Sequence, residues 1–142
     1  MPRKTDSSNP ADWIWIAESD LDAIRLLAER EIGYPLCRSK LAEVLEKILK
    51  AELLRIGWFL EKTHDLDKLL DHLQSRGSDL VTAAEPLCDA LAELYFTDRY
   101  PGFDLDDPDW PDFRAKLDRV TTLLKTIQTR VGGTTTGPDA GA

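Results

Sequence analysis

The stretch LAEVLEKILKAELLRI, residues 41–56, decides the fold. Its apolar residues return every three or four positions, which is the spacing of one face of an α-helix. They are Leu41, Val44, Leu45, Ile48, Leu49, Leu53 and Ile56. We predict that this stretch lies in a long central helix over about residues 36–60.

Helical spacing continues on both sides of this stretch. Asn9, Asp65 and Asp109 each precede an apolar stripe and suit the N-cap position, where a side-chain oxygen accepts a backbone N–H. Pro86 disfavours a helical conformation in the residue before it, so we expect a break there. The further predicted helices span about residues 10–31, 66–75, 87–98 and 110–131.

No segment alternates apolar and polar residues as a half-buried strand does. We therefore predict an all-α, antiparallel up-and-down bundle of about five helices, formed by residues 10–131. The polar segment 1–9 and the Gly- and Thr-rich segment 132–142 are predicted to be disordered tails. Trp58 and Phe59 add apolar surface beyond what a small bundle buries, which predicts a homodimer.

Composition limits the classes of partner that we expect for this protein. The 142 residues suffice for one domain, and 18 basic against 26 acidic residues give a net charge of −8, which disfavours binding to duplex DNA. No apolar run approaches the roughly 20 residues that span a bilayer. Because the polar start also lacks a secretory signal, we expect no membrane partner and a cytoplasmic protein. Cys37 and Cys88 lack zinc-site spacing and are expected to pack as small apolar residues.

Three short motifs occur in a fixed order along the chain. They are Glu-Lys-x-x-Lys-Ala at 46–51, Lys-Thr-His-Asp-Leu at 62–66 and Arg-Tyr-Pro at 99–101. In order and context they resemble the HEPN family of small α-helical domains, over roughly residues 11–131. The resemblance implies a dimerising bundle associated with nucleotides. Such domains are often encoded beside a minimal nucleotidyltransferase, in a two-component or toxin–antitoxin-like module.

The chain departs from one pattern of that family. Many members are metal-independent ribonucleases that use an Arg followed four to six residues later by a His. No His follows Arg99 at that distance, and no Arg precedes His64 or His72 at it. We therefore predict no catalytic residue. The expected function is a nucleotide- or substrate-binding partner of a separate nucleotidyltransferase. Two alternatives stay open: a divergent ribonuclease toxin, and a structural, antitoxin-like dimerisation scaffold.

Five residues form the predicted nucleotide-binding set: Lys50, Lys62, His64, Arg99 and Tyr100. The start of the helix after Asp65 offers unpaired N–H groups and a positive dipole end, so a phosphate there would have Lys62 as counter-charge and His64 as donor. The guanidinium fork of Arg99 suits phosphate, and Tyr100 can stack on a base. We expect these two helix ends to meet in a small cationic recess, and ATP is a candidate ligand.

Each of these assignments has a purely structural alternative. Asp65 as a cap, with His64 bonded to a backbone carbonyl, explains the corner without a ligand. Lys47 and Lys50, each four residues after a glutamate, form ion pairs that are typical of a solvated helix face. The acidic cluster at 104–112 lacks the Gly and the terminal Glu of a calcium loop, so we predict no metal site and no cofactor.

Overall fold

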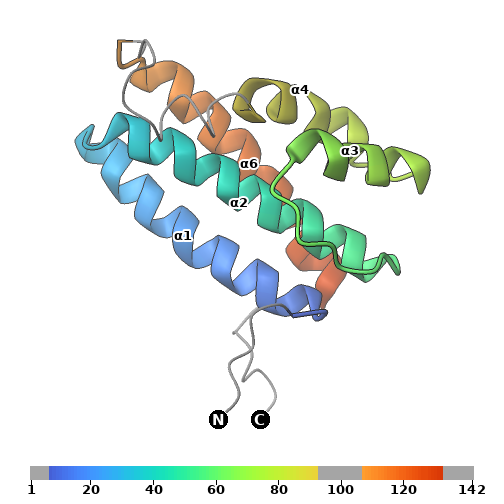
Figure 1. Cartoon of the computed structure of the whole chain (residues 1–142). Helices are drawn as coiled ribbons and strands as arrows, with labels where there is room; N and C mark the ends of the chain where they lie inside the picture. The colour runs from blue at the N-terminus through green and yellow to red at the C-terminus, as the bar shows by residue number, and fades with distance from the viewer. Residues whose placement is uncertain (1–6, 93–106, 133–142) are drawn as a thin grey trace, which may run out of the picture.

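The computed structural model of the protein describes residues 7–92 and 107–132. The helices in these ranges are α1 (Pro10–Arg30), α2 (Tyr34–Arg55), α3 (Leu66–Ser75), α4 (Val81–Ala92) and α6 (Trp110–Val131). Neither range contains a strand. Figure 1 shows α1, α2 and α6 side by side, with the antiparallel pair α3 and α4 packed against α2. The predicted all-α helical bundle is confirmed.

Helix α2 is the centre of the bundle. It contacts α1, α3, α4 and α6. A helix with apolar side chains around most of its circumference needs neighbours on several sides to bury them, and these four helices supply them for α2. Its fully buried apolar side chains are Cys37, Leu41, Val44, Leu45, Ile48, Leu49, Ala51 and Leu53. The sequence prediction of a central helix is confirmed, and residues 41–55 form its middle and its C-terminal end.

The three predicted N-caps are present. The Asn9 side chain accepts from the backbone N–H of Ala11 at 3.0 Å, and Asp109 accepts from Asp112 at 3.1 Å. Asp65 accepts from the N–H groups at positions 67 and 68, at 3.0 and 3.3 Å. Each cap satisfies N–H groups that have no partner inside the helix. The starts of α1, α3 and α6 are therefore determined by local sequence.

Helix α2 is shorter than predicted at its C-terminal end. It ends at Arg55, five residues before Leu60. Gly57 adopts a left-handed conformation with φ of 98°. The N–H of Gly57 donates to the carbonyl of Leu54, and that of Trp58 donates to the carbonyl of Leu53, at 3.2 and 2.9 Å. This pair of bonds is a Schellman motif, which closes a helix at a glycine.

The predicted break at Pro86 is wrong. Helix α4 runs unbroken through this residue, from Val81 to Ala92. A proline within a helix removes the N–H that would bond to the carbonyl four residues earlier, here that of Thr82. Both residues are exposed, so water can satisfy that carbonyl. Burial of Ala84, Leu87, Cys88 and Leu91 on the opposite face holds the helix together.

Arg130 ties the end of α6 to two other parts of the bundle. Its guanidinium donates to the Glu52 carboxylate on α2 at 2.6 Å and to both carboxylate oxygens of Asp79 at 2.9 and 2.7 Å. Arg55 donates to both carboxylate oxygens of Glu52, whose side chain is only 1% exposed. Hydrogen bonds from Arg130 hold the pKa of Asp79 below its ordinary value. The buried Glu52 is thus neutralised by two arginines.

Removing Arg130 tests this connection. We expect Arg130→Met to lower the free energy of unfolding by about 1–3 kcal/mol, because charge-assisted bonds to a buried carboxylate are lost. Urea denaturation at pH 7 measures this change. The matched control is Arg25→Met, whose partner Asp22 has a 67% exposed side chain, so its effect should stay below about 1 kcal/mol.

The difference in free energy of unfolding between wild type and Arg130→Met should depend on pH in one direction. Because Asp79 titrates below its ordinary range in the folded chain, its pair with Arg130 is complete at neutral pH. The pair is lost as the pH falls below about 4 and the carboxyl becomes protonated. The gap between wild type and Arg130→Met should therefore narrow on acidification. A gap that widens would contradict the assignment.

Candidate functional site

The connection between α2 and α3 carries the Lys-Thr-His-Asp-Leu motif. Thr63 donates its N–H to the carbonyl of Glu61 at 3.0 Å, and its hydroxyl accepts from the N–H of Asp65 at 3.2 Å. These two local bonds and the Asp65 cap fix the corner. They hold His64 against the side of α2, eighteen residues after Glu46.

A buried ion pair lies beneath this corner. Glu46 and Lys50 are 6% and 3% exposed, and Lys50 Nζ donates to Glu46 Oε2 at 3.0 Å. The ammonium also lies 5.1 Å from the ring centroid of Trp13 on α1, close enough for a cation–π contact. Burial of a charge is costly unless a partner compensates it. The Glu46 carboxylate and the aromatic face of Trp13 are the two groups that compensate the burial of the Lys50 side chain.

The same carboxylate holds the imidazole of His64. Nδ1 lies 3.0 Å from Glu46 Oε1 and 3.1 Å from Oε2. An ionised carboxylate only accepts hydrogen bonds, so Nδ1 carries the proton. In the neutral ring Nε2 then has the lone pair. The side chain of His64 is 68% exposed, whereas that of Glu46 is 8% exposed. A buried carboxylate thus orients an imidazole that faces solvent.

A second acid lies at the other side of the corner. Glu61 contacts Lys68 Nζ at 3.0 Å and His72 Nε2 at 2.9 Å. The hydrogen bond from Lys68 is the main cause that lowers the pKa of Glu61. The His72 ring in turn lies 5.6 Å from the ring of Trp58. These contacts fix the side of α3 that faces the corner.

Acidic residues outnumber lysines at the described corner. The acids are Glu46, Glu61, Asp65 and Asp67, and the lysines are Lys50, Lys62 and Lys68. The Asp65 carboxylate also takes up two of the N–H groups that a phosphate at the start of α3 would use. The predicted cationic recess also needs Arg99, which lies outside the described residues, so the recess stays a prediction.

The structure places three of the five predicted site residues. Lys62 and His64 are exposed at the corner, and Lys50 lies beneath them. Arg99 and Tyr100 lie outside the described residues. The structure therefore brings Lys50 and His64 to one carboxylate, that of Glu46. Their position relative to the Arg-Tyr-Pro motif stays a prediction.

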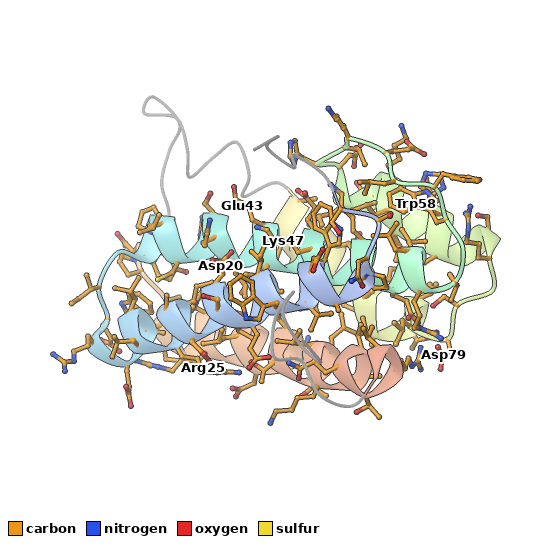
Figure 2. The ribbon with its side chains drawn as sticks, turned by 90° about the horizontal axis from the view of Figure 1, so that it is seen from below. Asp20, Arg25, Glu43, Lys47, Trp58 and Asp79 are labelled. Atoms are coloured by element: carbon orange, nitrogen blue, oxygen red, sulfur yellow. The ribbon has the colours of Figure 1, made fainter. Side chains whose placement is uncertain are left out.

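The expectation of a solvated lysine face is wrong for Lys50. The Glu46–Lys50 pair forms at the predicted spacing, but it is buried because α1 and the α2–α3 connection cover it. Lys47 lies 3.5 Å from Asp20 Oδ2 on α1, as the grouping of Asp20, Glu43 and Lys47 in Figure 2 shows. Exposed and buried Glu–Lys ion pairs have the same spacing along a helix, so the sequence alone did not show that the Lys50 pair is buried.

The described part of the chain offers neither a cluster of metal ligands nor a membrane-spanning helix. Within residues 7–92 and 107–132, His, Cys, Asp and Glu side chains form no group able to hold a metal ion. None of the helices in this part of the chain has the length and apolar character needed to cross a membrane. Trp58 is 5% exposed and Phe59 is 91% exposed, so of these two aromatic residues Phe59 alone adds to the apolar surface.

Comparison with known proteins gives one match. A family model described as the HEPN domain matches residues 10–129 of the chain, which is well over half of it. Searches of curated proteins and of solved structures give no match. The matched region contains all of the described helices except the last two residues of α6.

A double-mutant cycle tests the buried pair. Glu46→Gln leaves Lys50 without its carboxylate, and Lys50→Met removes the ammonium. We expect each change to lower the free energy of unfolding by about 3 kcal/mol. The double variant should lose less than the sum, with a coupling of about 1–3 kcal/mol in urea denaturation.

The control for this cycle lies on the same helix. Glu43→Gln affects an ion pair with Lys40, whose side chain is 41% exposed, and should cost less than about 1 kcal/mol. Strictly additive losses at Glu46 and Lys50 would show that the two side chains do not act as a pair.

Proposed function

The chain belongs to the HEPN domain family, and on that premise we propose that it is a nucleotide-binding helical partner of a separate minimal nucleotidyltransferase. Membership supports a nucleotide-related or ribonuclease-like function. The partner enzyme, a toxin–antitoxin-like setting and a homodimer are parts of this proposal. Nucleotide binding at the α2–α3 corner is its chemical core.

The observation that carries the proposal is the held imidazole. Glu46 fixes His64 at 3.0 Å, and Lys50 neutralises Glu46 from below. A ring that is fixed before binding loses little conformational freedom when a ligand arrives. The histidine is 68% exposed although the acid that holds it is only 8% exposed. Orientation of that ring toward a ligand accounts for the arrangement.

The chemistry suits a phosphate. Nε2 becomes a second donor when His64 takes up a proton, and the resulting imidazolium can donate to a phosphate oxygen. Lys62 is exposed on the same connection and adds a cation. Lys50 is too buried to touch the ligand, so its role is to position Glu46. Arg99 and Tyr100 are proposed to complete the site.

Calorimetry with ATP tests nucleotide binding. We expect weak binding by the wild-type chain, and we expect His64→Gln to reduce the affinity roughly tenfold, because one charge-assisted bond is lost. The matched control is His72→Gln, which changes the chain's other histidine and should leave the affinity unchanged. Equal losses in both variants, or no heat with ATP or GTP, would contradict the proposal.

The Glu46–His64 pair also favours one alternative function. With its proton on Nδ1, the neutral ring has its basic lone pair on Nε2, which is the kind of group that general acid–base catalysis needs. This would make the chain a divergent metal-independent ribonuclease. RNA cleavage in the presence of a chelator that disappears in His64→Gln, and persists in His72→Gln, would establish it. Intact RNA with the wild-type chain excludes it.

The partner is tested separately from the ligand. Mass spectrometry of complexes isolated with the tagged chain should identify a small nucleotidyltransferase. Such a complex without nucleotide binding by this chain would select the scaffold function. The homodimer rests on exposed apolar side chains, among them Trp15 at 45% and Phe59 at 91%. Light scattering that gives the mass of one chain would contradict it.

A further inference from the structure

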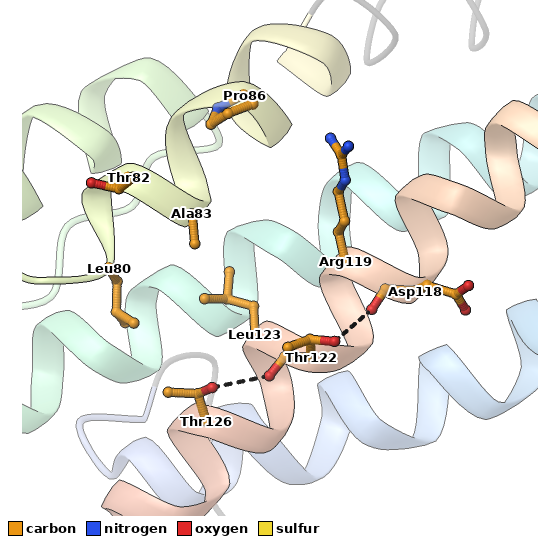
Figure 3. A pocket seen from close by; sticks show the side chains of 9 residues that line it. All are labelled: Leu80, Thr82, Ala83, Pro86, Asp118, Arg119, Thr122, Leu123 and Thr126. Carbon is orange, nitrogen blue, oxygen red and sulfur yellow. Dashed lines mark hydrogen bonds between the residues drawn. The ribbon is translucent and has the colours of Figure 1, made fainter.

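A cleft separates α4 from α6, away from the histidine corner. It has a volume of about 550 Å³, within the range of small-molecule sites. Figure 3 shows its two walls, with Leu80, Ala83 and Pro86 on the α4 side and Leu123 on the α6 side. These side chains make an apolar surface. The cleft shares no residue with the corner formed by Glu46, Lys50 and His64.

One cation faces this apolar surface. The side chain of Arg119 extends from α6 toward the Pro86 end of the cleft, while that of Asp118 points away from α4 (Figure 3). Arg119 has no ion pair or side-chain hydrogen bond with another residue of the described ranges. A guanidinium presents several donors in one plane and matches a carboxylate. It is therefore the anchoring group of the cleft.

The other polar groups of the cleft offer acceptors. The Thr122 hydroxyl donates to the carbonyl of Asp118 at 3.0 Å, and that of Thr126 donates to the carbonyl of Thr122 at 3.1 Å. Their protons are already in use. The Thr82 carbonyl lacks its helical donor because Pro86 has no N–H. A negative group in the cleft thus finds its charged donor on Arg119.

We propose that this cleft binds a small amphipathic carboxylate. The carboxylate pairs with Arg119, and an apolar chain lies along Ala83 and Leu123 toward Leu80. The α6 wall from Arg119 to Thr126 covers eight residues, and the rise from the first to the last is about 10 Å of helix. That length suits a medium-chain fatty acid. A cation of the same length would meet the positive charge of the Arg119 guanidinium and be repelled.

Decanoate is the probe for this site. We expect it to bind the full-length chain in calorimetry and to shift the backbone NMR signals of residues 80–86 and 119–126. Decyltrimethylammonium, which has the same chain and the opposite charge, should give no shifts in these segments. Arg119→Met should weaken decanoate binding roughly tenfold or more, since a hydrogen bond to a charged group is lost.

Two further variants make the result specific. Lys125→Met removes a neighbouring cation of α6 that does not line the cleft, and decanoate affinity should stay as in wild type. Ala83→Trp places a large ring at an exposed position of the cleft wall and should abolish binding. Decanoate affinity unaffected by Arg119→Met, or shifts at residues 46–64 in place of the cleft, would overturn the proposal.

Discussion

The carboxylate of Glu46 is the contact on which the candidate site depends. It lies in the middle of the central helix, where water cannot compensate the charge of Lys50. It also reaches the only part of the α2–α3 connection that carries an imidazole. One buried acid thus couples the interior of the bundle to its surface. Without it, Lys50 would be an uncompensated buried cation and the His64 ring would lose the acceptor that orients it.

Helix α2 uses buried charge twice in the same way. Glu46 binds His64 of the α2–α3 connection, and Glu52, six residues later, binds Arg130 at the end of α6. Apolar contacts are non-directional, whereas a buried carboxylate needs a hydrogen-bond partner at a defined position. We infer that these two pairs fix which turn of α2 faces each neighbour. The corner and the end of α6 therefore have defined positions relative to the central helix.

Local signals made most of the fold predictable, and the exceptions have physical causes. Caps such as Asn9 and Asp65 act through bonds within one turn, so the sequence contains their whole explanation. The end of α2 was predicted too late because Trp58, Phe59 and Leu60 continue the apolar run past Gly57. At Pro86, packing of the inner face of α4 outweighed a local preference. The burial of Lys50 depends on α1 and the α2–α3 connection, which helical spacing does not describe.

We propose that Glu46 holds His64 with its proton on Nδ1, so that Nε2 is the atom that binds a phosphate. Two-bond ¹H–¹⁵N NMR spectra of the histidine rings, recorded at pH 7 with and without ATP, show which ring nitrogens carry protons. We expect a protonated Nδ1 on His64 in both samples and a protonated Nε2 on addition of ATP, with no change at His72. A His64 ring that is protonated only at Nε2 before ATP is added, or a His64 spectrum that does not change when ATP is added, would contradict this proposal.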